Sequence, residues 1–471
     1  MKHYQAVVVG GGIVGAGIFR DLSLHGINVL LIDKHDFSSQ TSHKSSKMLH
    51  GGIRYLENLD FKLVFEALHE KNNWLKLTPH LTREVPLHLP VFNDSKRPLW
   101  MIKCGLFLYD LLSSFKNSPH LIKNKVKTLE SIPILKSDGL KGCGVYFDGI
   151  MDDAKITLEV IFDALLYPNA SAQNHTELID VQIRDNKNIL TLKNHLSGQI
   201  EKISCNQVVY SLGPYTDKFL SQFKIYNWSP VLLPSKGSHI WLSSKDLPLN
   251  SPIVITSKDE RVIFVIPHDD LVLVGTTEVD YRGSYDNVKA STDEIQYLLK
   301  EVNNYFPSLN LSTNHIISTF SGIRPLISEG DSSRGKTSRE HKIFQPLSNT
   351  YVIAGGKYTT FRVMGREISQ EICHKNQKSY NQDLSLSKLK IQSRVLPFSW
   401  KVPTDLDFIY ICENELPKTF EDLVKRRLSI PNRKTWDLKN PNLDFDIFFN
   451  SKITILSKYF PLSKEIIANF E

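Results

Sequence analysis

The chain has 471 residues, of which 41% are hydrophobic and 23% charged, and its formal net charge is +7 at pH 7. It is too long for one simple core, so two or three domains of a globular protein are expected. The mild basic excess would suit an anionic substrate, an anionic lipid or a nucleic acid, and a basic solvated surface without a ligand would explain it as well.

The five cysteines are scattered and show no CxxC spacing, which argues against a disulfide framework or a metal site and for a reducing compartment. The first predicted strand begins at residue 6, so no signal peptide is expected before it. No run of 18 consecutive apolar residues occurs, and we therefore expect no transmembrane helix.

The first predicted elements are a strand, a helix and a second strand. The apolar run Ala6–Val9 precedes a G-x-G-x-x-G motif, and a helical pattern then leads to Val29–Ile32, which Asp33 closes. In such a unit the glycines allow a tight turn and close approach of a pyrophosphate, and the carboxylate can bind a ribose. We expect a dinucleotide site here. The alternative is a glycine-rich turn in another α/β protein.

A segment rich in hydroxyl groups follows, where a nicotinamide-binding unit normally enters its next crossover. From Ser38 it reads SSQTSHKSSKMLHGGIRYLE. Its hydroxyl and ammonium groups suit an extended ligand with a second stretch of pyrophosphate and a ribityl chain. Gly51 and Gly52 allow a flat ring to approach the backbone. The alternative is a solvated serine loop.

Helical spacing over Phe61–Leu77 ends at two prolines, and residues 87–97 look extended. An apolar helix is predicted over Pro98–Phe115, and the lysine-bearing stretch Lys116–Lys127 follows it. An apolar helix beside a cationic patch is what a peripheral membrane protein uses to dock on anionic lipid. A buried helix with a solvated lysine loop would have the same sequence.

Residues 151–215 alternate between helix and strand. A helix through about Leu166 precedes strands at Glu177–Val181 and Ile189–Leu192, and a further strand, Gln207–Leu212, ends in Gly213. This alternation places the segment back in the dinucleotide domain.

The hydrophobic period then changes to that of strands, which predicts an antiparallel sheet that can cover a ring system and form a substrate cavity. Its predicted strands are 239–242, 252–256, 261–267 and 271–281. Residues 292–306 show helical spacing again. Strand Tyr351–Ala354 returns to the first domain and precedes a glycine pair and a helix, a place where backbone amides could face an anionic ring.

Five motifs stand in order along the chain. They are GGGxxGAG with TSxxSSKxxHGGxRYLE, VIPHDDLVLVGTTEVDY at 265–281, SGIRPL at 321–326, SRE at 338–340 and IAGGKYTTFR at 353–362. This set resembles the FAD-dependent glycerol-3-phosphate dehydrogenases of the aerobic, quinone-linked type. More loosely, residues 409–430 resemble the cap-domain helix of that family.

The resemblance implies an α/β fold with a Rossmann-like FAD-binding domain of the glutathione-reductase type, an antiparallel-sheet substrate domain and a helical C-terminal region. We expect the FAD-binding domain at 1–80, 150–215 and 340–377. The substrate domain is expected at 81–149 and 216–339, and a linker with the C-terminal cap region at 378–471.

The motif positions also imply site residues. For FAD they are Gly10, Gly12, Ile13, Val14, Gly15, Asp33, Lys34, Thr41, Ser45, Ser46, Lys47, His50, Gly51, Leu178, Gly213, Gly356, Lys357 and Thr359. Because arginine and lysine suit a phosphate ester, the substrate residues are expected to be Arg54, Tyr55, Thr276, Thr277, Arg324, Arg339 and Lys357. As catalytic residues we expect Arg324 and the base His239, since a histidine titrates near neutrality. The competing His50 is expected to hold the flavin loop.

The activity implied is oxidation of sn-glycerol 3-phosphate to dihydroxyacetone phosphate, with a hydride passing to flavin N5 and electrons to a membrane quinone. The resemblance further implies a cytoplasmic protein attached peripherally to the inner face of the cell membrane on anionic lipid. It implies no nucleic-acid partner and leaves a homodimer open.

Three alternatives remain. A glycerol-3-phosphate oxidase would use O2, although the compact spacing of the motifs favours the dehydrogenase. A flavin-dependent RNA-modifying or RNA-binding protein would use the net positive charge, but no aromatic-basic motif for nucleic acid is present. A non-catalytic flavoprotein scaffold has no support in the sequence.

Overall fold

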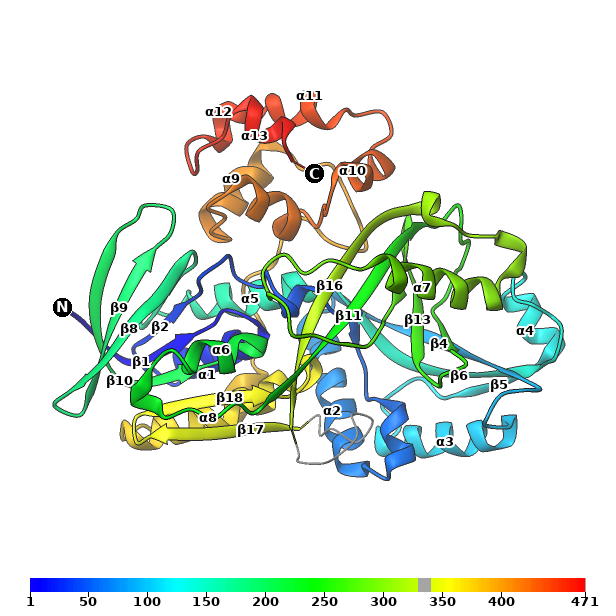
Figure 1. The fold of residues 1–471 in the computed structure, drawn as a ribbon, viewed down its shortest axis with the longest axis horizontal. Coiled ribbons are helices and arrows are strands. Elements are labelled where there is room, and N and C mark those ends of the chain that lie inside the picture. The colour runs from blue at the N-terminus through cyan, green and yellow to red at the C-terminus, as the bar shows by residue number, and fades with distance from the viewer. Residues whose placement is uncertain (329–339, 471) are drawn as a thin grey trace.

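The computed structural model describes residues 1–328 and 340–470, which fold around two β-sheets with helices packed against them (Figure 1). The first sheet has eight strands and the second has ten, and the C-terminal helices form a separate group at the top of the view. The expected fold class, an α/β fold with a helical C-terminal region, is confirmed. The predicted domain boundaries stay a prediction.

The first sheet has a parallel centre. Its order is β17 (His341–Leu347), β18 (Thr350–Gly355), β10 (Ile200–Tyr210), β1 (Lys2–Val9), β2 (Val29–Ile32) and β7 (Ala170–Gln173). All but β17 run parallel, and β8 (Thr176–Arg184) and β9 (Lys187–Asn194) continue from β10 as an antiparallel hairpin. Helices α1 (Ile13–Leu24), α5 (Asp153–Ala164) and α8 (Phe361–Lys375) bury their apolar sides against this sheet. The short α6 (Thr216–Leu220) follows β10.

The second sheet is almost wholly antiparallel. Its order is β15 (Val279–Asp280), β11 (Leu232–Ser243), β14 (Leu271–Gly275), β13 (Val262–His268), β12 (Ile253–Thr256), β4 (Thr82–Phe92), β6 (Leu140–Met151) and β3 (Met48–Leu49). β16 (Ile316–Ile327) pairs with β11 and β5 (Leu121–Asn124) with β6, while α7 (Thr292–Tyr305) packs on β11.

Two helices pack beside the second sheet. They are α2 (Phe61–Leu77) and α3 (Leu99–Leu112), which contact each other at the bottom of the view, and α4 (Lys125–Ser131) follows β5 (Figure 1). In the described ranges, no helix is both long enough and apolar enough to cross a membrane.

The C-terminal region has its own aromatic core around Trp436 and Phe449. Its elements are α9 (Asp405–Asn414), the π-helical turn η10 (Asp422–Arg427), α10 (Arg433–Lys439), α11 (Phe445–Asn450), α12 (Ile453–Leu456) and α13 (Lys464–Ala468).

Some predicted elements were wrong in detail. The segment predicted as extended over residues 87–97 is instead β4, which begins at Thr82 and ends at Phe92 because its partner β6 fixes its length. The segment predicted as one strand over 271–281 is two strands, since β14 ends at Gly275 and β15 pairs with another part of β11.

Candidate active site

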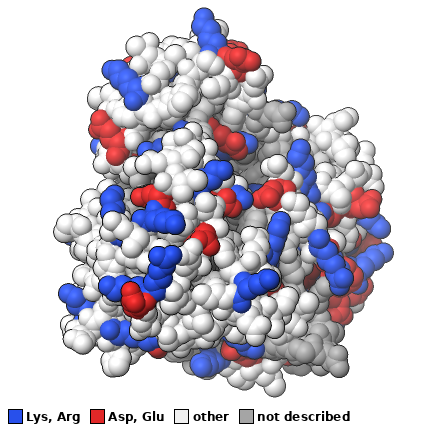
Figure 2. Space-filling view, turned by 60° about the vertical axis from the view of Figure 1, so that its left-hand side comes forward, with Lys and Arg blue, Asp and Glu red and all other residues white. Residues whose placement is uncertain are grey.

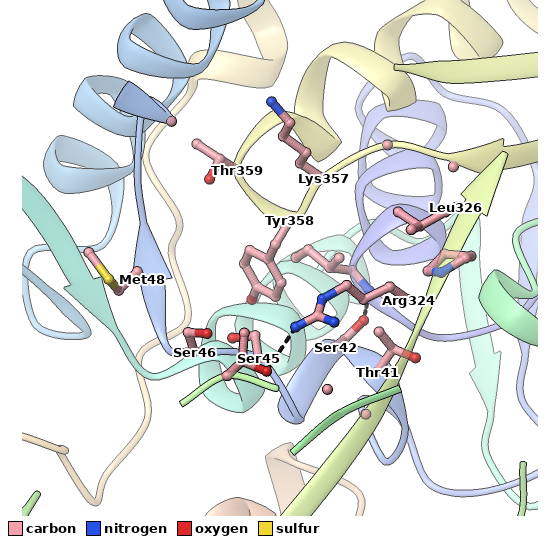
Figure 3. A pocket seen from close by; sticks show the side chains of 18 of the residues that line it. Thr41, Ser42, Ser45, Ser46, Met48, Arg324, Leu326, Lys357, Tyr358 and Thr359 are labelled. Carbon is pink, nitrogen blue, oxygen red and sulfur yellow. Dashed lines mark hydrogen bonds between the residues drawn. The ribbon is translucent and has the colours of Figure 1, made fainter. Parts of the chain in front are cut away.

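A cavity of about 1520 Å³ lies at the carboxyl ends of the parallel strands of the first sheet and extends along the second sheet. Its lining includes Gly10 after β1, Asp33 after β2, Gly213 after β10 and Gly355 at the end of β18. In open α/β sheets, ligands bind at this edge. Figure 3 shows part of the cavity, with Arg324 reaching into it from β16.

The glycine motif forms a cradle that side chains would fill. Gly10 has φ +110°, and a Cβ there would lie 2.5 Å from the carbonyl oxygen of Ser211. A Cβ on Gly15 would lie 1.8 Å from the carbonyl oxygen of Gly10, so only glycine allows α1 to pack this closely. Helix α1 begins directly after Gly12, and its N-terminal amides therefore carry the partial positive charge that a pyrophosphate needs.

Asp33 stands beside this cradle. Its carboxylate accepts hydrogen bonds from the backbone amides of Gly11 at 2.7 Å and His35 at 2.8 Å. Burial raises the pKa of Asp33 to about 6. A carboxylate so placed can still accept hydrogen bonds from a ribose, and the residues of this region fit a dinucleotide.

Hydrogen bonds to other parts of the chain hold the serine-rich segment in place. The Thr41 hydroxyl donates to the carbonyl of Ile323 at 2.8 Å, and the Ser45 hydroxyl donates to Asp153 at 2.6 Å. The ammonium of Lys47 also binds Asp153, at 2.6 Å. These contacts hold the segment beside the cavity, and Ser42 accepts a hydrogen bond from the amide of Ile13 at 2.9 Å.

Most residues predicted for FAD line the cavity. They are Gly10, Gly12, Ile13, Val14, Asp33, Lys34, Thr41, Ser45, Ser46, His50, Leu178, Gly213, Gly356, Lys357 and Thr359. Gly15, Lys47 and Gly51 do not line it: Gly15 packs against Gly10, Lys47 binds Asp153, and the Gly51 amide donates to Tyr109. The role of each residue in binding stays a prediction.

The residues predicted for the substrate meet in the same cavity. Arg324 donates to the Thr276 hydroxyl at 2.8 Å and to the carbonyl of Thr277 at 3.3 Å, which fixes its guanidinium. The Lys357 ammonium lies 3.8 Å from the centre of the Tyr55 ring. Arg54 is exposed but also lines the cavity. Arg339 lies outside the described residues.

His239 is on β11, where only 2% of its surface is exposed, yet it lines the cavity. Its Nε2 shares a hydrogen bond of 2.9 Å with the Ser46 hydroxyl, and its ring stacks on Phe320 at 4.7 Å. Burial and the nearby Arg324 and Lys47 cations hold the pKa of His239 well below its usual range. The imidazole is therefore neutral at pH 7, the form that a general base requires, and the same surroundings weaken its basicity.

A buried network that the sequence did not reveal lies behind Thr276 and Thr277. The Glu294 carboxylate on α7 accepts hydrogen bonds from the hydroxyls of Ser238 and Thr277, both at 2.8 Å, and pairs with Lys236 at 2.7 Å. The only local signal was the sequence Ser-x-x-Glu at the start of α7, which forms a capping box.

A second unpredicted network supports the Gly51-Gly52 turn. The amide of Gly51 donates to the Tyr109 hydroxyl at 2.9 Å, and that hydroxyl donates to Asp148 at 2.8 Å. Lys71 pairs with Asp148 at 3.4 Å, and all three side chains are buried. Tyr109 belongs to α3, so this helix directly contacts the segment that carries His50 and Arg54.

Comparison with known proteins gives a consistent match. The family model of the FAD dependent oxidoreductases (DAO) matches residues 5–371. Over 394 residues the chain is 34% identical to a glycerol-3-phosphate dehydrogenase of Synechocystis sp., with 80% of this chain and 71% of that protein covered. It is 30% identical to the aerobic glycerol-3-phosphate dehydrogenase of Bacillus subtilis, with 83% and 70% covered.

Solved structures share the fold. The glycerol-3-phosphate dehydrogenase of Bacillus halodurans complexed with FAD has a TM-score of 0.66 and 27% identity, covering 82% of this chain and 67% of that chain. The L-α-glycerophosphate oxidase of Mycoplasma pneumoniae with FAD bound has a TM-score of 0.62 over 86% of this chain and 100% of that chain. Its identity of 17% supports a shared fold only.

Proposed function

The chain belongs to the FAD dependent oxidoreductases and, among them, to the glycerol-3-phosphate dehydrogenase family, and we propose that it oxidises sn-glycerol 3-phosphate at C2 to dihydroxyacetone phosphate. Its cofactor is FAD. When bound, FAD supplies the hydride acceptor, flavin N5, and we propose a membrane quinone as the final acceptor of the electrons.

The residues that would hold FAD are the glycine cradle with Asp33 at the nucleotide end and the glycine pair at the other. Gly355 and Gly356 have positive φ values of 73° and 80°, and the turn η8 (Tyr358–Thr360) follows them. Amides at such a turn can donate to an anionic ring.

One observation carries the substrate proposal: Arg324 is fixed by Thr276 and Thr277 in the same cavity as His239 and the glycine cradle. A guanidinium fork held in place can bind two oxygens of a phosphate ester. Arg54 and Lys357 add positive charge, and Arg324 is proposed to orient the substrate so that its C2 hydroxyl faces the base. His239, neutral in its buried position, would accept the hydroxyl proton as the hydride leaves C2.

The experiment is anaerobic addition of sn-glycerol 3-phosphate to the FAD-loaded protein while the visible flavin absorption is recorded. Bleaching is expected. Arg324→Ala should lower kcat/KM by roughly 10- to 100-fold, because it removes charged hydrogen bonds, and Arg324→Lys should recover part of the loss.

Arg282, which is exposed and outside the cavity, offers the matched control, and Arg282→Ala should behave as the unaltered protein. No bleaching of the unaltered protein would contradict the proposed substrate. Rapid peroxide formation in air would replace the quinone with O2 as the acceptor.

We further propose that the protein docks peripherally on the inner, cytoplasmic face of the cell membrane through an apolar surface on α2 and α3. The exposed apolar side chains of this docking face are Leu59, Phe61, Phe65, Trp100, Met101, Phe107, Leu111 and Phe115. Exposed lysines flank it at positions 62, 103 and 116. Aromatic side chains with lysines around them suit the boundary of an anionic bilayer, and each lysine near such a surface contributes about 1 kcal/mol.

The charges on one face of the molecule bear on the alternative of nucleic-acid binding. On the face drawn in Figure 2, Lys and Arg are interspersed with Asp and Glu and do not form one continuous basic surface. A nucleic-acid footprint would need clustered basic side chains. The face drawn in Figure 2 therefore gives no support to nucleic-acid binding.

Sedimentation with vesicles tests the docking face. The protein should bind vesicles that contain anionic lipid and bind neutral vesicles much less. The double variant Trp100→Glu/Phe107→Glu should lose binding, whereas Leu406→Glu, at an equally exposed position on α9, should keep it. Equal binding by both variants would contradict this surface.

A further inference from the structure

The C-terminal region is joined to the FAD-binding sheet by a buried cluster of charges. Arg426 and Arg427 in η10 both bind the carboxylate of Asp36, and Arg427 Nη2 lies 3.0 Å from Asp36 Oδ1. Arg426 also pairs with Asp422 at 2.7 Å, and Asp422 accepts a hydrogen bond from His175 at 2.8 Å. Of these charged side chains, Asp36 is 1% exposed and Arg427 is fully buried.

Further hydrogen bonds hold the side chains of this cluster in place. Asp36 accepts a further hydrogen bond from the Asn174 amide at 2.9 Å, and Arg427 donates to the carbonyl of Glu415 at 2.8 Å. Although burial alone would raise it, the two guanidinium groups hold the pKa of Asp36 well below its usual range. Removing one member would leave an opposite charge buried without compensation, so the cluster holds both sides in one arrangement.

Asp36 lies in the nucleotide loop, residues 33–40, three positions after Asp33. The amide of Ser38 donates to the carbonyl of Gly11 at 3.0 Å, and Asp33 accepts from the amide of Gly11. Phe37 packs so closely on Gly11 that a Cβ there would lie 2.4 Å from its ring. The nucleotide loop therefore shapes the glycine cradle directly, and most of its residues line the cavity.

The backbone of His175 and Thr176 pairs with this loop, and the cluster holds that segment as well. The amide of His175 donates to the carbonyl of His35 at 2.9 Å, and the amide of Thr176 donates to that of Asp33 at 2.7 Å. His175 in turn binds Asp422 of the C-terminal region. The C-terminal region thus contacts two backbone segments that border the nucleotide end of the cavity, the nucleotide loop and the segment at His175.

We propose that the C-terminal region is a clamp on the nucleotide loop, in which Arg426 and Arg427 act as positioning residues that hold Asp36 and thereby the loop in the shape that binds FAD. Clamping and FAD binding then favour each other, because the coupling of two binding events is reciprocal. The inference depends on FAD as cofactor and not on the identity of the substrate.

Hydrogen exchange of the full chain, with and without FAD, tests the coupling. The amides of Lys418 and Thr419 donate to Asp422, both at 3.0 Å, and report on the C-terminal side. FAD should slow their exchange by roughly tenfold, a factor within the range of ordinary coupling between sites. If FAD protects the glycine cradle but leaves these amides unchanged, the clamp is refuted.

A variant tests the same claim from the other side. Asp36→Asn keeps the shape of the side chain but removes its charge, and it should weaken FAD binding by roughly tenfold in a fluorescence titration. Asp446→Asn is the control, because it breaks the ion pair with Arg433, which lies within the C-terminal region but outside the cluster. FAD affinity equal to that of the unaltered protein in Asp36→Asn would overturn the proposal. Should that variant not fold, the exchange experiment alone decides.

Discussion

At the scale of residues, the cavity depends on side chains that do not reach it. Glu294 binds the Thr277 hydroxyl, and Thr277 offers its carbonyl to Arg324. The position of the guanidinium therefore depends on a carboxylate one layer away. Ser46, which itself lines the cavity, holds His239 in a similar way, since its hydroxyl orients the imidazole.

Glu294→Ala should raise KM for the phosphate ester by roughly tenfold with a smaller change in kcat, because the ground-state position of Arg324 relaxes. It should also lower the free energy of unfolding by about 1–3 kcal/mol, since buried hydroxyls lose their partner. Asp293→Ala, an exposed change on the same helix, is the control. Steady-state kinetics and denaturant unfolding measure both effects, and an unchanged KM would contradict the role of Glu294.

The pH dependence of flavin reduction tests His239. Its pKa is lowered, so the neutral form, which accepts the proton, persists as pH falls through the usual histidine range. Stopped-flow rates should therefore stay level from about pH 8 to about pH 6, whereas an ordinary histidine would lose activity near 6.5. His239→Ala should slow reduction by roughly 10²- to 10⁴-fold. A normal rate in this variant would remove His239 as the base.

At the scale of elements, α3 has three different sides. Trp100 and Phe107 face outward, Ile102 and Leu108 line the cavity, and Tyr109 is buried against the Gly51 amide. Its approach to the sheet depends on glycine in β6, since a Cβ on Gly144 would lie 2.6 Å from Ile102. One helix thus joins the docking face to the segment that carries the substrate residues.

Tyr109→Phe removes only the hydroxyl of this link. We expect kcat/KM to fall by roughly tenfold while vesicle binding is retained, because the Gly51 turn loses its main acceptor and the outer side of α3 is unaltered. Tyr226→Phe removes a comparable buried hydroxyl, bonded to Tyr210 at 2.6 Å and away from the cavity. If both variants lose the same activity, the effect is general destabilisation and the link has no special role.

The elements also show what the sequence could predict. The β1–α1–β2 unit and α3 were predicted because their signals are local: a hydrophobic period, a glycine motif and helix ends. Strand β6 was not, since its sequence LKGCGVYFDGIM contains three glycines that argue against a strand. It is a strand because β4 pairs along its whole length and α3 packs on its glycines. Such long-range pairing leaves no local pattern.

The residues of the candidate site also fall into a group that the sequence could predict and a group that it could not. Arg324, Lys357 and the glycine cradle could be predicted because they stand in motifs, and they line the cavity, while their roles stay a prediction. Ser42, Glu294 and Tyr109 were not, since each acts through a partner distant in sequence, and a single serine, glutamate or tyrosine carries no signal of its own.

At the scale of the whole molecule, the C-terminal region is attached through charged groups that are removed from water. Beside the cluster, Glu415 is 2% exposed, and one of its carboxylate oxygens has no hydrogen-bond partner among the described residues. Burial raises the pKa of Glu415 to about 7, against the opposite influence of Lys155 and Arg427. The folded protein therefore holds a proton that the unfolded chain releases near pH 4.5.

A raised pKa in the folded state means that stability is greatest at low pH and falls as pH rises through the window from about 4.5 to about 7. The loss from this group should approach roughly 3 kcal/mol. Glu415→Gln should remove this part of the pH dependence, while the exposed Glu413→Gln should not. Denaturant unfolding at several pH values measures the difference, and identical profiles for both variants would contradict the assignment.

The order of strands in the first sheet has a consequence for synthesis on the ribosome. β1 and β2 emerge first, but β10, the neighbour of β1, begins at Ile200, and β18 beyond it begins at Thr350. The nascent chain must therefore carry an open edge of β1 until β10 is made, and then an open edge of β10 until β18 is made, and such edges attract other chains. FAD cannot find its complete pocket until the turn at residues 355–359 has also been made.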